Sequence, residues 1–150
     1  MKKIRMTFEK GGELTGYLNE EWAPETVMAV WSALPTEDVL KHTRYCGHEV
    51  YFAVSTGVAP KRENHTATVS KFDISYWRQD WDPCLDLTPE EAGETIGFYS
   101  APEFIQYSGG TNPLNVIGRI DYSQEAMLDE IEERVWREGQ EKVRIERLED

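Results

Sequence analysis

The side chains with the clearest chemical potential lie together in one hairpin-like stretch. Two β-rich runs flank a Cys-Gly dipeptide at 46–47, a pattern typical of a tight hairpin. Because side chains alternate between the two faces of a strand, His42 and Arg44 share one face of the first run. We expect this basic pair to lie beside Glu49 and Tyr51 of the second run. Such a surface could bind a ligand, or it could be only the solvated face of a sheet.

Cysteine and histidine chemistry has less support. Cys46 and His48 are two residues apart in a turn, where they point poorly at each other, so a nucleophilic pair is not indicated. The histidines His42, His48 and His65 stand at no recognised metal-ligand spacing. Neither Cys46 nor Cys84 belongs to a Cys-x-x-Cys pair, so both are expected to be free, structural thiols. No phosphate-binding glycine loop is present. The sequence predicts no metal and no cofactor, and it assigns no catalytic residue.

The charge balance narrows the classes of partner. The chain has 28 acidic and 16 basic residues and a net charge of −12, which repels nucleic acid and anionic membranes. The first six residues alternate apolar and charged side chains, so they do not form a signal peptide, and no apolar run reaches membrane-spanning length. We expect a cytoplasmic protein in which residues 1–150 form a single domain.

Hydrophobic periodicity predicts the elements that position these residues. Alternating apolar and polar residues indicate eight short strands. They cover 4–8, 14–18, 39–45, 48–54, 72–77, 95–99, 114–120 and 143–148. Apolar stripes at helical spacing predict helices over 24–34 and 123–138. Residues 55–71 and 101–113 are predicted as loops, and 78–94 as an acidic, turn-rich segment of unknown role with a candidate short strand at 84–87.

The number and order of these elements indicate the fold class. Too few helices separate the strands for a parallel sheet built from β-α-β units. We therefore predict a mainly β protein, a closed or nearly closed antiparallel β-barrel of about eight strands with two α-helices.

Several short motifs occur in order along the chain. They are Ala-Pro-Glu-Thr at 23–26, Leu-Pro at 34–35, His-Thr-Arg-Tyr at 42–45, Glu-Asn-His-Thr at 63–66, the strand 95–99, Asn115, and Trp-Arg-Glu-Gly-Gln at 136–140. On these motifs the chain resembles a bacterial cyclophilin-like family of unknown function, small β-barrels with a helix at either end. The resemblance spans residues 23–140 and implies a fold but no established activity. Phe72, where such proteins usually have Gly, and the length of 78–94 depart from the family pattern.

The resemblance also singles out residues for a small-molecule site. The polar residues at family-like positions, with two aromatic neighbours, are Arg44, Glu63, Asn64, Tyr76, Trp77, Tyr99 and Asn115. Together they could form an apolar pocket with a few polar contacts, in a groove beside the central hairpin. Because a guanidinium binds a carboxylate through two parallel hydrogen bonds, a small polar or acidic molecule is the expected ligand. The alternative is that Glu63 and Asn64 only cap and turn a loop, while Arg44 pairs with an acid.

Two other functions stay open, and so does the question of whether the protein is an enzyme. The wider cyclophilin fold implies peptidyl-prolyl cis-trans isomerisation, with Arg44 near the prolyl amide, but the apolar Phe-x-x-x-x-Gln-Gly-Gly motif of true cyclophilins is missing. The third function is non-catalytic assembly. Trp136 widens the apolar face of the second helix, and Trp22, Trp81 and Tyr107 fall in predicted loops, where aromatic residues often mark an interface. A homodimer is the simplest such assembly.

Overall fold

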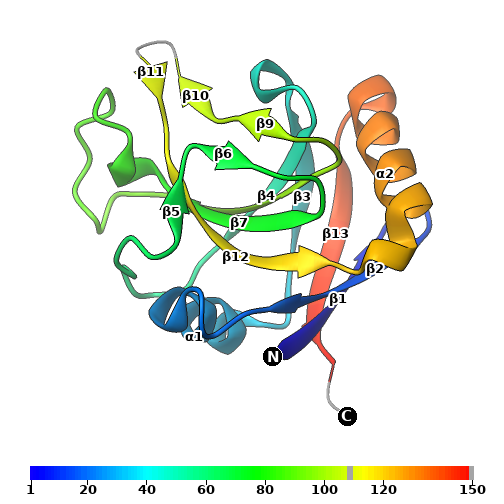
Figure 1. The fold of residues 1–150 in the computed structure, drawn as a ribbon, viewed down its shortest axis with the longest axis horizontal. Coiled ribbons are helices and arrows are strands. Elements are labelled where there is room, and N and C mark those ends of the chain that lie inside the picture. The colour runs from blue at the N-terminus through cyan, green and yellow to red at the C-terminus, as the bar shows by residue number, and fades with distance from the viewer. Residues whose placement is uncertain (108–109, 149–150) are drawn as a thin grey trace.

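Eight antiparallel strands form the frame of the computed structural model, which describes residues 1–107 and 110–148. They are β1 (Lys2–Phe8), β2 (Glu13–Leu18), β3 (Thr36–Thr43), β4 (Glu49–Val54), β7 (Asp73–Arg78), β8 (Glu94–Tyr99), β12 (Leu114–Ile120) and β13 (Glu141–Arg147). Their order is β2-β1-β13-β3-β4-β8-β7-β12, and β12 also pairs with β2. The sheet therefore closes into the predicted antiparallel barrel (Figure 1).

Two helices and several shorter pieces complete the fold. The helices are α1 (Pro24–Ala33) and α2 (Glu125–Glu138). The short strands are β5 (His65–Thr66), β6 (Thr68–Val69), β9 (Glu103–Phe104), β10 (Gln106–Tyr107) and β11 (Gly110–Thr111), and the single 3-10 turns are η1 (Arg44–Cys46), η2 (Gln79–Trp81) and η3 (Tyr122–Gln124). None of the helices in the described residues has the length and apolar character needed to cross a membrane.

Alternating side chains fill the barrel. On β1 the inward residues Ile4, Met6 and Phe8 are at most 3% exposed, as the period of two predicts. Both helices add to this core, α1 through Val27 and α2 through Ile131. Figure 1 shows the two helices against different sides of the barrel. The apolar core therefore holds both helices and all the long strands in one unit.

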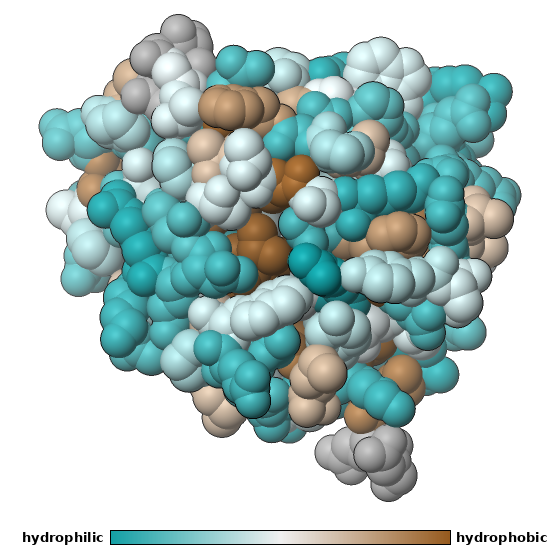
Figure 2. All heavy atoms as spheres, viewed as in Figure 1, coloured by the Kyte–Doolittle hydropathy of each residue, from teal (hydrophilic) through white to brown (hydrophobic). Residues whose placement is uncertain are grey.

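A second, smaller apolar cluster lies on the outer face of the strands. It is composed of Cys46, Val69, Tyr99, Ile105, Leu114 and Val116, with Trp22 and Trp77 packed against it. Figure 2 shows hydrophilic side chains over most of one face of the molecule and a patch of apolar ones near its middle, over the region of β7 and β12. Ile105, from the segment between β8 and β12, belongs to this cluster, so part of the outer sheet surface is buried from solvent.

Some element predictions need correction. The candidate strand at 84–87 is wrong, because these residues form turns and irregular structure. The two predicted loops are not free of pairing, since 55–71 contains β5 and β6, and 101–113 contains β9, β10 and β11. These strands are only two residues long and therefore show no alternation that a sequence could reveal.

Barrel closure requires glycine where β12 crosses β2. Gly118 pairs with Leu18, and Ile120 pairs with Gly16. A Cβ atom on Gly118 would lie only 2.0 Å from the carbonyl oxygen of Tyr17. The obstructing atom belongs to the backbone of the partner strand, so it can move away only if the seam opens.

We predict that Gly118→Ala destabilises the protein by about 3 kcal/mol, because overpacking against rigid backbone costs roughly this much. Gly93→Ala is the matched control, since there the nearest atoms belong to the flexible side chain of Gln79 at 3.0 Å or more. The control should stay within about 0.5 kcal/mol of wild type. Urea unfolding monitored by circular dichroism measures both. Equal stability of the two variants would contradict the close approach of β2 and β12.

Candidate functional site

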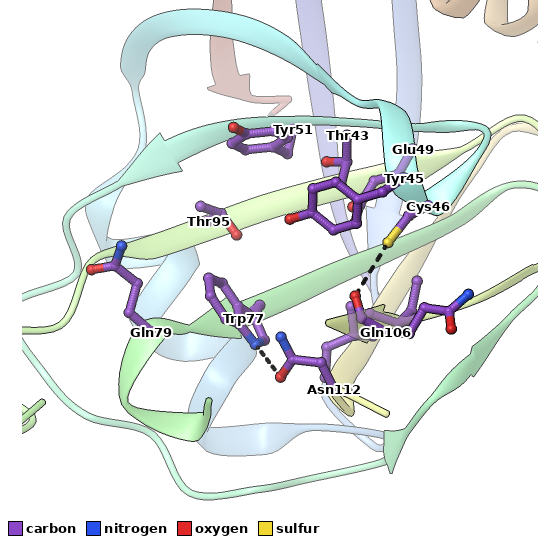
Figure 3. A pocket seen from close by; sticks show the side chains of 12 residues that line it. Thr43, Tyr45, Cys46, Glu49, Tyr51, Trp77, Gln79, Thr95, Gln106 and Asn112 are labelled. Atoms are coloured by element: carbon purple, nitrogen blue, oxygen red, sulfur yellow. Dashed lines mark hydrogen bonds between the residues drawn. The ribbon is translucent and has the colours of Figure 1, made fainter. Parts of the chain in front are cut away.

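A pocket opens beside the central hairpin, on the outer face of the barrel. On β4, Val50 and Phe52 point into the core, so Glu49 and Tyr51 point outward into this pocket. The cavity measures about 280 Å³. It is lined by Thr43, Tyr45, Cys46, Glu49, Tyr51, Trp77, Gln79, Thr95, Ile105, Gln106, Asn112 and Leu114 (Figure 3).

The floor of the pocket is a buried carboxyl group held by hydroxyls. Glu49 is 8% exposed, and the hydroxyl of Tyr99 donates a hydrogen bond to its carboxylate. The Ser75 hydroxyl lies 2.8 Å from that of Tyr99. All three groups sit above Gly97, where a Cβ atom would lie 2.8 Å from a Glu49 oxygen and 3.0 Å from Ser75 Oγ. Glycine at 97 therefore makes room for the acid and the hydroxyls.

Burial sets the protonation of this floor. Burial raises the pKa of Glu49, hydrogen bonds from Tyr99 and Thr43 oppose that shift, and the nearby Glu103 adds to it. Burial and then Glu49 raise the pKa of Tyr99, so its hydroxyl keeps its proton and acts as a donor. No basic side chain in residues 1–107 and 110–148 forms an ion pair with Glu49. The carboxyl group is therefore a buried acid without a counter-ion.

Aromatic rings form the walls of the pocket. Trp77 comes from β7, Tyr51 from β4 and Tyr45 from η1, and Figure 3 shows Tyr45 reaching from its turn across the pocket toward Thr95. The indole N–H of Trp77 donates to Asn112 Oδ1 at 3.0 Å, which fixes the orientation of the ring. Walls of this kind suit a ligand with an apolar or positively charged surface.

Cys46 lies at one edge of the pocket as a protonated thiol. Burial raises its pKa, and a backbone contact to the Gln106 carbonyl, 3.9 Å from Sγ, opposes this. A raised thiol pKa disfavours the thiolate that nucleophilic chemistry requires. Cys46 therefore acts here as a packing residue.

Three of the predicted site residues meet elsewhere, at the start of α1. Glu63 accepts hydrogen bonds from the backbone N–H and the hydroxyl of Thr26, at 2.8 and 2.7 Å. Asn115 accepts from the Glu63 N–H at 3.0 Å and donates to the Thr26 hydroxyl at 3.0 Å. Asn64, with φ of 46°, donates from its side chain to the carbonyl of Val116. These bonds attach the 55–71 segment to α1 and β12, as the capping alternative expects.

Tyr76 and Tyr99 lie on opposite faces of the sheet. Tyr99 supports the pocket floor, whereas Tyr76 is fully buried in the barrel core. The Tyr76 hydroxyl donates to Glu94 and accepts from Arg78 at 3.0 Å, and Arg78 also contacts Glu94 at 3.3 Å. Of the seven residues predicted for a site, Trp77 lines this pocket, and Tyr99 is buried beneath it as the donor to Glu49.

Arg44 and His42 face α2 instead of Glu49, which corrects the expected grouping. Arg44 donates to the carbonyl of Trp136 at 2.7 Å and lies 4.3 Å from the centre of its indole, and the ring of His42 lies 4.8 Å from the same indole. A two-residue turn would have paired His42 with Tyr51, but η1 shifts the register by one, so His42 pairs with Val50. A shift of one residue moves every side chain to the other face.

The sequence places Glu49 and Tyr51 on one face of a strand but assigns neither to a site. It does not identify Tyr45, Thr95 and Asn112, because no local pattern connects three segments that only the barrel brings together. The one usable signal is a glutamate at the start of the apolar run 49–54, because burying a carboxyl group costs free energy unless it has a partner.

Residues 7–147 match the family described as "Protein of unknown function (DUF3830)". The structure of McbB in complex with tryptophan has a TM-score of 0.72 and 15% identity, with 98% of this chain covered. The chain spans only 45% of the McbB chain. The solution structure of the hypothetical protein AF2241 from Archaeoglobus fulgidus has a TM-score of 0.58 and 28% identity, covering 98% of this chain and 95% of that one. No curated protein matches.

We predict that Glu49→Gln stabilises the protein increasingly as the pH rises. The folded pKa of Glu49 lies above its unfolded value, so the stability that the protonated acid provides is complete below the unfolded pKa of about 4.5 and is lost as pH rises through the folded pKa. Glutamine keeps the shape without ionising. Thermal unfolding at a series of pH values measures the difference.

The exposed Glu21→Gln is the matched control and should follow wild type throughout. A difference between Glu49→Gln and wild type that is constant with pH would show that the Glu49 carboxyl ionises as easily in the folded chain as in the unfolded one.

Proposed function

The chain belongs to the DUF3830 family of proteins of unknown function, and we propose that it binds a small polar molecule in the pocket beside its central hairpin. The observation that carries the proposal is the buried Glu49 carboxyl at the base of an open cavity. Glu49 has hydrogen-bond donors in Tyr99 and Thr43, but ionising a buried carboxyl group without a counter-ion still costs free energy. A ligand that pairs with it regains part of that cost on binding.

The composition of the pocket supports the same proposal. Small-molecule sites combine apolar and aromatic walls with a few placed polar groups. Here Tyr51, Trp77 and Leu114 supply the walls, and Glu49 and Asn112 supply polar groups. The cavity volume of about 280 Å³ suits a compact ligand.

We do not propose an organic acid as the ligand, because that expectation depends on Arg44. The Arg44 side chain instead contacts Trp136, outside the pocket. The described lining contains no Lys or Arg. For the same reason we propose no isomerase step, because the only residue suggested for the cationic role lies elsewhere. The cyclophilin-like relationship fits a closed barrel with two helices and remains part of the proposal, and the homodimer stays a prediction.

An NMR experiment on the Trp77 indole N–H tests pocket binding. Isotope-labelled protein is titrated with a panel of amines, alcohols, carboxylates and amino acids, including tryptophan because McbB was solved with it. At least one compound should shift the Trp77 signal with a dissociation constant of about 1 mM or tighter. Trp77→Phe assigns the signal.

Two matched variants locate the binding. Thr95→Phe fills the pocket and should remove the response, whereas Thr68→Phe, at an exposed position of β6, should leave it intact. If no compound shifts the signal, or if the shifts persist in Thr95→Phe, the pocket is not a ligand site.

A further inference from the structure

The charged neighbours of the pocket are acids. Burial raises the pKa of Tyr45, and negative groups that include Asp82 raise it further. Burial also raises the pKa of Cys46, and Glu49 and Glu103 add to that shift. In the described lining the only ionisable groups besides Glu49 are two tyrosines and a thiol, all of which are neutral or negative and never positive. With a net charge of −12 for the whole chain, the potential in the pocket favours a positively charged group.

The walls of the pocket suit the same charge. A cation over the face of Trp or Tyr is attracted by the ring quadrupole, and several rings around one site bind alkylammonium groups. Tyr51 from β4 and Trp77 from β7 stand on opposite sides of Thr95 from β8, and Tyr45 reaches toward Thr95 from its turn (Figure 3). Tyr45 is 75% exposed, so its ring is available to close on a ligand.

A second acidic hollow, beside α2, is less suited to a ligand. It is a cleft of about 620 Å³ that includes Glu132 and Arg44. The Glu132 carboxylate already accepts from Ser100 at 3.2 Å and lies 3.5 Å from His42 and 3.9 Å from His48. Arg44 also belongs to this cleft, whereas no Lys or Arg lines the pocket that holds Glu49.

We propose that the ligand of the pocket carries an alkylammonium group, with Glu49 as its counter-ion and Tyr45, Tyr51 and Trp77 around it. This inference rests on the proposed function, because it names the class of molecule that the same pocket binds. The ammonium replaces the missing partner of the buried acid, and its apolar substituents contact the rings. Trp77 is the best placed of these rings, because Asn112 already holds it in position.

Binding of such a ligand is coupled to the ionisation of Glu49. Tyr99 from β8 and Thr43 from β3 donate hydrogen bonds to the Glu49 carboxyl group. The other titratable groups near it are Glu103, Tyr45 and Cys46. Nδ1 of His48 lies 2.5 Å from the Glu103 carboxylate. A fixed positive charge in the pocket stabilises only the ionised form of Glu49. Affinity therefore falls as the pH falls through the raised pKa of the free carboxyl group.

The test compares three molecules of one shape. Choline has a fixed positive charge, its carbon isostere replaces the nitrogen with a quaternary carbon and is neutral, and tert-butylacetate is an anion. Each is titrated into wild-type protein while the Trp77 indole signal is recorded. Choline should bind about tenfold more tightly than the neutral isostere, and tert-butylacetate should bind least. Lowering the pH should weaken choline binding and leave the isostere unaffected.

Two variants assign the effect to the pocket. Glu49→Gln should remove most of the preference for choline over the isostere, whereas Glu132→Gln, in the other cleft, should keep it. Equal binding of choline and its isostere, or tighter binding of tert-butylacetate, would overturn the ammonium inference and leave the pocket as a ligand site. If none of these compounds and none of the wider panel perturbs Trp77, the proposed function itself fails.

Discussion

A carboxyl group buried without a counter-ion is the constraint on which the site depends. Glu49 is the first residue of β4, the second strand of the central hairpin. Tyr99 donates a hydrogen bond to it, and Gly97 leaves room for it above the sheet. The neighbouring charge of Glu103 makes ionisation harder still. Ionising a buried carboxyl group costs free energy unless a positive charge pairs with it. The open cavity above Glu49 is where such a partner can enter.

The barrel wall separates two buried apolar regions, one inside the barrel and one on its outer face. The inner core holds Val50 and Phe52, and the outer cluster beneath the segment between β8 and β12 holds Cys46 and Ile105. A strand that is buried on both faces can carry a polar side chain on its outer face without exposing it to bulk water. The pocket lies at the edge of the outer cluster. Its floor, at Glu49, is therefore buried, and Tyr45 at its mouth is exposed.

Much of the frame could be predicted from the sequence, and the site only in part. Strong alternation on β1 and the apolar stripe of α2 identify their elements, because burial of one face dominates there. Closure of the barrel rests on Gly16 and Gly118, two glycines far apart in the chain whose close approach no local pattern reveals. The sequence predicts the wrong face for the side chains of the first hairpin strand, because η1 shifts the pairing register between the two strands by one residue.

Titration of the Glu49 side-chain carboxyl carbon by NMR, in free protein and with saturating choline, tests most directly whether Glu49 is a buried acid that awaits a cation. We expect a midpoint above the ordinary glutamate value of 4.5 in the free protein, and a lower midpoint when choline is bound. A midpoint at or below 4.5 without ligand, or one that choline does not change, would contradict it.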